Sequence, residues 1–129
     1  MILQESGENY LETILMLQQQ NGSVRSIDIA THMNFTKASV SIAMKKLREN
    51  GYIAVDGEGN LTLLEPGLEI AQRIYSRHQL LTHFFVQLGV DEQTAAEDAC
   101  KAEHILSEQT LEKIRESALR NDAAHPQAK

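Results

Sequence analysis

The sequence has no tryptophan, one cysteine and two prolines among its 129 residues, and only 5% of its residues are aromatic. A single cysteine excludes an internal disulfide, which fits a reducing compartment and predicts a cytoplasmic protein. No apolar run approaches the roughly 18 residues of a membrane-spanning helix, so we expect neither a membrane anchor nor a signal peptide. The core must rest on Leu, Ile, Val, Ala and Met, in one compact domain or two small subdomains.

Cationic side chains are also scarce overall, and the formal net charge is −6. The charge is segregated along the chain. Residues 26–50 carry four cations and two anions, whereas residues 91–116 carry eight anions and three cations. Because phosphate contacts come from local patches, the first of these segments is the one suited to nucleic acid.

Apolar periodicity predicts a mainly α protein, with helices over residues 7–20, 26–33, 36–50, 67–88, 91–106 and 107–119. Ser26, Thr36 and Ser107 are the expected N-caps, and Gly51 is suited to the position after a helix C-cap. The period changes at "YIAV" and "LTLL", which flank the loop "DGEGN" and predict a β-hairpin.

Helix, short helix, tight turn, longer helix and hairpin in this order are typical of a winged helix-turn-helix. We therefore predict a DNA-binding domain over residues 1–65, a helical domain over residues 66–120 and a mobile polar tail over residues 121–129. In such a fold the helix at residues 36–50 would lie in the major groove of DNA.

The predicted reading helix carries six candidate DNA contacts: Thr36, Lys37 and Ser39 for base edges or phosphates, and Ser41, Lys45 and Lys46 for the phosphate backbone. Its exposed face lacks the Arg, Asn and Gln best suited to paired base contacts, so specificity would rest on Thr, Ser, apolar contacts and DNA shape. Asp56 and Glu58 make the hairpin tip a poor phosphate binder. The alternative is a solvated helix face on a winged helix that binds protein.

A second pattern, "EDACKAEHILS" at residues 97–107, brings together a thiol, a carboxylate and an imidazole. At about 100° per residue, Cys100, Glu103 and His104 fall within about a third of a helix circumference. These are the three main donor types for a divalent transition metal, and other helices must complete the coordination. The candidates there are Asn9, Glu12 and His78.

Other interpretations of this pattern remain open. Cys100 could be a small buried hydrophobe, with Glu103 and His104 on a solvated acidic face. Cys100 could instead be a redox sensor in a metal-independent winged-helix regulator. The thiol and imidazole imitate a Cys–His nucleophile pair, but no oxyanion hole or glycine-rich approach accompanies them, so we do not expect an enzyme or a small organic substrate.

Four segments resemble the metal-dependent repressors of the diphtheria toxin repressor and manganese transport regulator type. They are "ENYLETILML", "VRSIDIATHMNFTKASVSIAMKKLRENGYI", "SRHQLL" and "ACKAEHILS", in the family's order from about Gly7 to Leu111. The resemblance implies a homodimer whose subunits each carry a winged helix and a helical metal-binding and dimerisation half. It also implies Fe²⁺ or Mn²⁺ as the effector, with Co²⁺, Ni²⁺ or Zn²⁺ able to bind in vitro, and a palindromic double-stranded DNA operator.

The resemblance implies a set of metal ligands. The ligands of the family's dimerisation half correspond to Cys100, Glu103 and His104. The histidine of its long helix corresponds to His78, and the carboxylate of its manganese-type members corresponds to Glu12. Cys100 follows the iron type, so the two patterns are mixed and iron is slightly favoured. Asn9 stands where Asp or Met is expected. Thr82 and Ala96 lack the ligands of the iron-type second site, and the length suggests the short form without an SH3-like domain.

Overall fold

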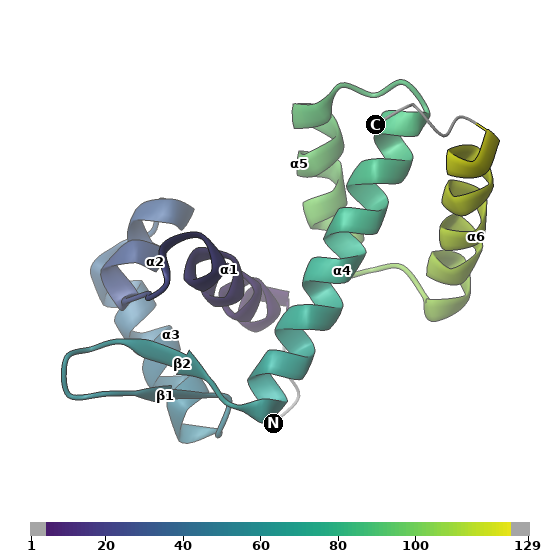
Figure 1. Ribbon diagram of the computed structural model, residues 1–129. Coiled ribbons are helices and arrows are strands. Elements are labelled where there is room, and N and C mark those ends of the chain that lie inside the picture. The colour runs from purple at the N-terminus through teal and green to yellow at the C-terminus, as the bar shows by residue number, and fades with distance from the viewer. Residues whose placement is uncertain (1–4, 125–129) are drawn as a thin grey trace. The chain divides into compact units, whose positions relative to one another are not determined.

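The computed structural model describes residues 5–124 and confirms a mainly α chain with one small antiparallel sheet (Figure 1). Its elements are α1 (Glu5–Asn21), α2 (Ser26–Met33), α3 (Lys37–Glu49), β1 (Ile53–Val55), β2 (Leu61–Leu63), α4 (Glu65–Gln87), α5 (Glu92–Ala102) and α6 (Glu108–Ala124). The chain forms two compact units, Met1–Arg73 and Ile74–Lys129, and the division falls within α4. None of the described helices is long and apolar enough to cross a membrane.

The first unit is a winged helix-turn-helix built around a small aliphatic core. Side chains spaced at helical intervals on α1 are fully buried together with residues of the following elements: Leu11, Ile14, Val24, Ile29, Val40 and Ile53. Gly22 ends α1 with a φ of 83°, which glycine adopts without the Cβ penalty of other residues. The core holds α3 beneath α1 and α2 and leaves one face of α3 in solvent.

The N-terminus of α2 has an unexpected cap, and the N-terminus of α3 has the predicted one. The prediction of Ser26 as the N-cap of α2 is wrong, because Arg25 takes that position and Ser26 is the first helical residue. Asp28 Oδ2 accepts the Arg25 backbone N–H at 2.8 Å, so the cap bond comes from inside the helix. Thr36 caps α3 as predicted, its Oγ1 accepting the Ser39 backbone N–H at 3.1 Å.

The hairpin confirms the predicted wing. Ile53 pairs with Leu63 and Val55 with Leu61 in antiparallel register. Asp56 orders the connecting loop, since its Oδ1 accepts the backbone N–H groups of Glu58 and Asn60, each at 2.9 Å. These hydrogen bonds, led by the one from the Asn60 backbone, lower the pKa of Asp56.

The second unit packs α5 and α6 against α4 around a small core. Its buried centre is Leu81, Ala99 and Leu111, with the half-buried side chains Leu80, Phe85, Ala102, Leu106 and Ile114 against it. Asp91 caps α5, and Ser107 caps α6 as predicted, accepting the Thr110 backbone N–H at 3.2 Å.

A polar cluster holds the C-terminal end of α6 against the last turns of α4. His83 Nε2 lies 2.9 Å from Asp122 Oδ1, and Gln87 Nε2 donates to the same oxygen at 2.9 Å and to the Ala118 carbonyl at 3.1 Å. These contacts explain why α6 continues to Ala124, past the predicted end near Leu119. Residues 121–124 are therefore helical, and residues 125–129 of the predicted tail lie outside the described residues.

Candidate metal centre and DNA-binding surface

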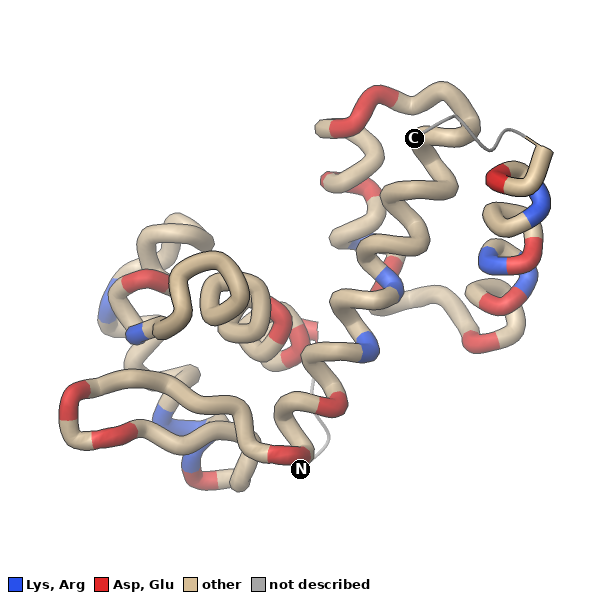
Figure 2. Tube along the Cα trace, in the orientation of Figure 1, with Lys and Arg blue, Asp and Glu red and all other residues tan. Residues whose placement is uncertain are grey.

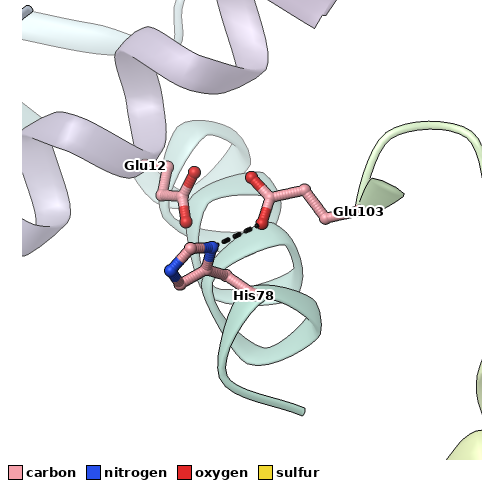
Figure 3. A group of neighbouring side chains, drawn as sticks. All are labelled: Glu12, His78 and Glu103. Atoms are coloured by element: carbon pink, nitrogen blue, oxygen red, sulfur yellow. Dashed lines mark hydrogen bonds and ion pairs between the residues drawn. The ribbon is translucent and has the colours of Figure 1, made fainter. Parts of the chain in front are cut away.

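The second unit brings His78 and Glu103 into direct contact. His78 projects from α4, Glu103 follows α5, and Figure 3 shows the two side chains pointing toward each other. His78 Nδ1 lies 3.1 Å from Glu103 Oε2. The Glu103 side chain has no solvent exposure, whereas 26% of the His78 side chain is exposed. One partner of the pair is thus buried and the other reaches solvent.

The second carboxylate oxygen of Glu103 is in an unusual position. Oε1 lies 3.4 Å from His104 Nε2, and only 3% of the His104 side chain is exposed. Even so, Oε1 is buried and has no hydrogen-bond partner among the described residues. A buried acceptor without a hydrogen bond costs about 1–3 kcal/mol, so this oxygen is the best candidate in the site for a cation ligand.

The backbone around Glu103 corrects the predicted helix over residues 91–106. α5 ends at Ala102, because the Ile105 and Leu106 N–H groups both bond the Ala102 carbonyl, at 3.1 and 3.3 Å. Glu103 is the C-cap and turns inward, whereas Cys100 on the last helical turn is exposed. Of Cys100, Glu103 and His104, only Cys100 therefore belongs to α5 itself.

Arg77 holds this turn from α4, and nothing in the sequence pattern singled it out. Its Nη1 donates to the Glu103 backbone carbonyl at 3.2 Å, and its Nη2 pairs with Glu108 at the start of α6. Only 15% of the Arg77 side chain is exposed. Arg77 thereby fixes the backbone of Glu103 while His78, the next residue, meets the carboxylate.

The other two predicted ligands lie on α1 in the first unit. Asn9 and Glu12 are both half-buried, and the Asn9 backbone carbonyl accepts the Thr13 hydroxyl at 2.8 Å. Glu8 on the same helix pairs with Arg73 at 3.4 Å. Glu12, His78 and Glu103 each offer one oxygen or nitrogen ligand atom.

These residues fit a divalent cation on chemical grounds. A carboxylate oxygen that is buried without a partner, next to two imidazoles, matches the mixed oxygen and nitrogen set of first-row transition metals. Imidazole and carboxylate can also satisfy one another, as His78 and Glu103 do. Cys100 is the predicted ligand that the structure leaves exposed.

The candidate DNA contacts form the outer face of α3. The six predicted residues, Thr36, Lys37, Ser39, Ser41, Lys45 and Lys46, are all exposed. The opposite face of the helix buries Val40, Met44 and Leu47 as predicted. Figure 2 shows the basic residues on α3 and acidic residues at the tip of the hairpin, which agrees with a reading helix and a weakly binding wing.

Two of these six residues already use their hydroxyl groups in hydrogen bonds within the protein. The hydroxyls of Thr36 and Ser39 lie 2.8 Å apart and share a hydrogen bond, in addition to the cap bond between them. Because each hydroxyl has only one donor hydrogen, the two side chains have less capacity to hydrogen-bond the edges of bases.

Comparison with known proteins assigns each half of the chain. Residues 2–61 match the family described as "Iron dependent repressor, N-terminal DNA binding domain". Residues 64–126 match "Iron dependent repressor, metal binding and dimerisation domain".

Individual relatives agree with these matches. An uncharacterized HTH-type transcriptional regulator of Methanocaldococcus jannaschii is 36% identical over 115 residues, covering 88% of this chain and 92% of that protein. The transcriptional regulator MntR of Bacillus subtilis is 34% identical over 109 residues, covering 84% of this chain and 77% of MntR.

Solved structures show the same fold. A manganese-dependent transcriptional repressor in complex with manganese superposes with a TM-score of 0.79 at 25% identity, covering 87% of this chain and 52% of that one. The manganese regulator SloR gives a TM-score of 0.77 at 25% identity, covering 89% of this chain and 54% of that one. The chain thus spans about half the length of these two structures.

Proposed function

Because the chain belongs to the family of iron-dependent repressors, whose members are DNA-binding transcriptional regulators and not enzymes, we propose that it is a metal-responsive repressor. It acts in the cytoplasm as a homodimer on a palindromic operator, and Fe²⁺ or Mn²⁺ is its effector. Repression of metal-uptake genes is the biological role that such an effector suggests.

The observation that carries the metal proposal is the Oε1 atom of Glu103, which is buried beside His104 and has no hydrogen-bond partner among the described residues. Glu103, His78 and His104 supply the ligands of the second unit, and Glu12 supplies a further carboxylate from α1 (Figure 3 labels three of the four). Asn9 adds an amide oxygen as a weaker donor. Cys100, on the last turn of α5, adds a thiolate donor to the proposed set.

Dimerisation has support within the second unit. Among its described residues, four large apolar side chains are exposed: Val86, Leu88, Ile105 and Leu119. Ile105 and Leu88 are 78% and 65% exposed, and a dimer interface over them would remove this apolar surface from water. A second copy of the chain is the partner proposed for these side chains.

The proposed switch is a change in the population of two arrangements. A cation supplies positive charge that offsets the carboxylates of Glu12 and Glu103. Since it draws ligands from both units, it favours arrangements in which two reading helices of a dimer fit half-sites about one DNA turn apart. A nearly complete switch needs a difference in metal binding of about 5.5 kcal/mol between the two arrangements.

The test is a gel shift under anaerobic conditions. DNA would be selected from a random duplex library, and the apo-protein titrated with Fe²⁺ and, separately, with Mn²⁺. We expect metal to tighten binding by at least tenfold in the wild type and not in Glu103→Gln. The matched control is Glu97→Gln, which removes an exposed carboxylate from α5.

Two outcomes would contradict the proposal. Equal DNA binding with and without metal would exclude the switch. Metal-independent binding that peroxide abolishes in the wild type but not in Cys100→Ser would identify a redox sensor in its place.

A further inference from the structure

The outer face of α3 carries one large apolar side chain that the proposed function has not used. Ile42 is 60% exposed and is the only large hydrophobic residue exposed on this helix, all of which the structure describes. It lies opposite Val40, Met44 and Leu47, which bury the inner face, so Ile42 contributes nothing to the core.

The neighbours of Ile42 on this face are small or cationic. At helical spacing, Ala38 lies one turn before Ile42, and Lys45 and Lys46 lie one turn after it, all exposed. Cations on this face suit the phosphates at the edges of a groove. An apolar side chain between them therefore faces the floor of the groove, where the base edges lie.

Three of the short polar side chains at the ends of α3 are engaged within the fold itself. The Thr36 and Ser39 hydroxyls bond one another at the helix start, and Asn50 Nδ2 donates to the Lys46 carbonyl at 2.8 Å. Beside the lysines, which suit phosphates, the face presents the methyl groups of Ala38 and Ile42. In the major groove the matching apolar group is the C5-methyl of thymine.

Resting on the proposed DNA-binding function, we propose that Ile42 is a specificity-determining residue that recognises thymine by contact with its C5-methyl group, assisted by Ala38. Contact with one methyl group excludes water from both surfaces. Burial of one methyl-sized group is worth about 0.8 kcal/mol, which is about a fourfold change in affinity for each thymine contacted.

Deoxyuridine provides the direct test, because it pairs as thymine does but lacks the methyl group. A duplex selected with the Mn²⁺-loaded wild type would be resynthesised with deoxyuridine in place of each thymine in turn. We expect one or two positions in each half-site to lose about fourfold in affinity for the wild type. Ile42→Ala should bind the thymine duplex more weakly and lose the sensitivity to deoxyuridine at those positions.

The control variant is Ile27→Ala, which removes a side chain 43% exposed on α2. It should keep the wild-type sensitivity at every position. Thermal unfolding of both variants should match the wild type within about 0.5 kcal/mol, as expected for exposed sites.

Each result decides a separate question. If no duplex is selected in the presence of metal, the proposed function fails and this inference with it. If a duplex is bound specifically but deoxyuridine changes nothing, or Ile42→Ala keeps the full thymine preference, the role of Ile42 is refuted and the repressor function stands.

Discussion

Replacement of Glu103 by glutamine should stabilise the apo-protein and remove most of the stabilisation that metal provides. In the apo-protein the substitution replaces a buried, unpartnered carboxylate oxygen with an amide nitrogen. That nitrogen can donate toward His104 Nε2, which lies 3.4 Å away, and the amide oxygen can keep the contact with His78. The variant is otherwise nearly isosteric.

The magnitude follows from the desolvation of the unpaired oxygen. Relief of one buried unsatisfied acceptor is worth about 1–3 kcal/mol. For a chain of this size we expect the apo melting temperature to rise by about 4 °C for each kcal/mol. In the wild type, Mn²⁺ at 100 times its dissociation constant adds about 2.7 kcal/mol, and the variant should lose most of that gain.

The assay is thermal unfolding at fixed protein concentration, with and without Mn²⁺, for wild type, Glu103→Gln and the exposed control Glu97→Gln. We expect the variant to melt above the wild type without metal and to gain much less than the wild type when metal is added, and the control to follow the wild type in both. If Glu103→Gln melts lower than the wild type without metal, the unpaired oxygen carries no penalty. If the variant keeps the full metal shift, Glu103 is not a ligand.

Three further changes test separate parts of the structure. Gly67→Ala should destabilise the protein by about 1–3 kcal/mol in urea unfolding, because its Cβ would overlap the Tyr52 carbonyl oxygen. Arg77→Met should weaken Mn²⁺ binding by about tenfold in calorimetry, since it releases the backbone of Glu103 while leaving every proposed ligand in place. Asp91→Asn should lower stability at neutral pH, and its difference from the wild type should vanish as the pH falls below the ordinary aspartate value of 3.8.

The sign for Asp91 follows from its cap bonds. The Thr94 hydroxyl and backbone N–H donate to its carboxylate at 2.8 and 3.1 Å and lower its pKa. Folding therefore favours the charged form of Asp91. Its contribution to stability is present above the pKa of Asp91 in the unfolded protein and is lost as the pH falls through the lower pKa of the folded protein.

Matched controls keep these three tests specific. Gly57→Ala should be nearly neutral, because its Cβ meets nothing within 4 Å. Arg73→Met removes an exposed ion pair on the same helix and should leave metal binding unchanged. Asp98→Asn removes an exposed carboxylate of α5, and its stability relative to the wild type should not change with pH in the way expected for Asp91→Asn. Equal effects of test and control would contradict the explanation in each case.

The parts of the fold that local signals encode were predictable from the sequence. Thr36, Ser107 and Gly51 act as expected, because capping depends on the backbone within a few residues of each. The end of α6 was not predictable in this way, since His83 and Gln87 of α4 hold its last turn from a distance of 31 to 39 residues along the chain.

The candidate site was predictable in its residue types and not in its geometry. Helical periodicity placed Cys100 and Glu103 on one helix, whereas α5 ends between them, with Cys100 exposed and Glu103 buried. Arg77 was missed because it bonds a backbone carbonyl, and any residue type can provide that acceptor. The choice of ligands stays a prediction that the variants above address.

The two sides of α3 have consequences for how such regulators diversify. Val40, Met44 and Leu47 maintain the fold, whereas Ile42 and its exposed neighbours make no demand on it. After gene duplication, one copy could therefore acquire a new operator through a substitution at position 42 without passing through an unfolded intermediate. Because the exposed face can change without affecting the core, several repressors that each bind only their own operator could be engineered on the same fold.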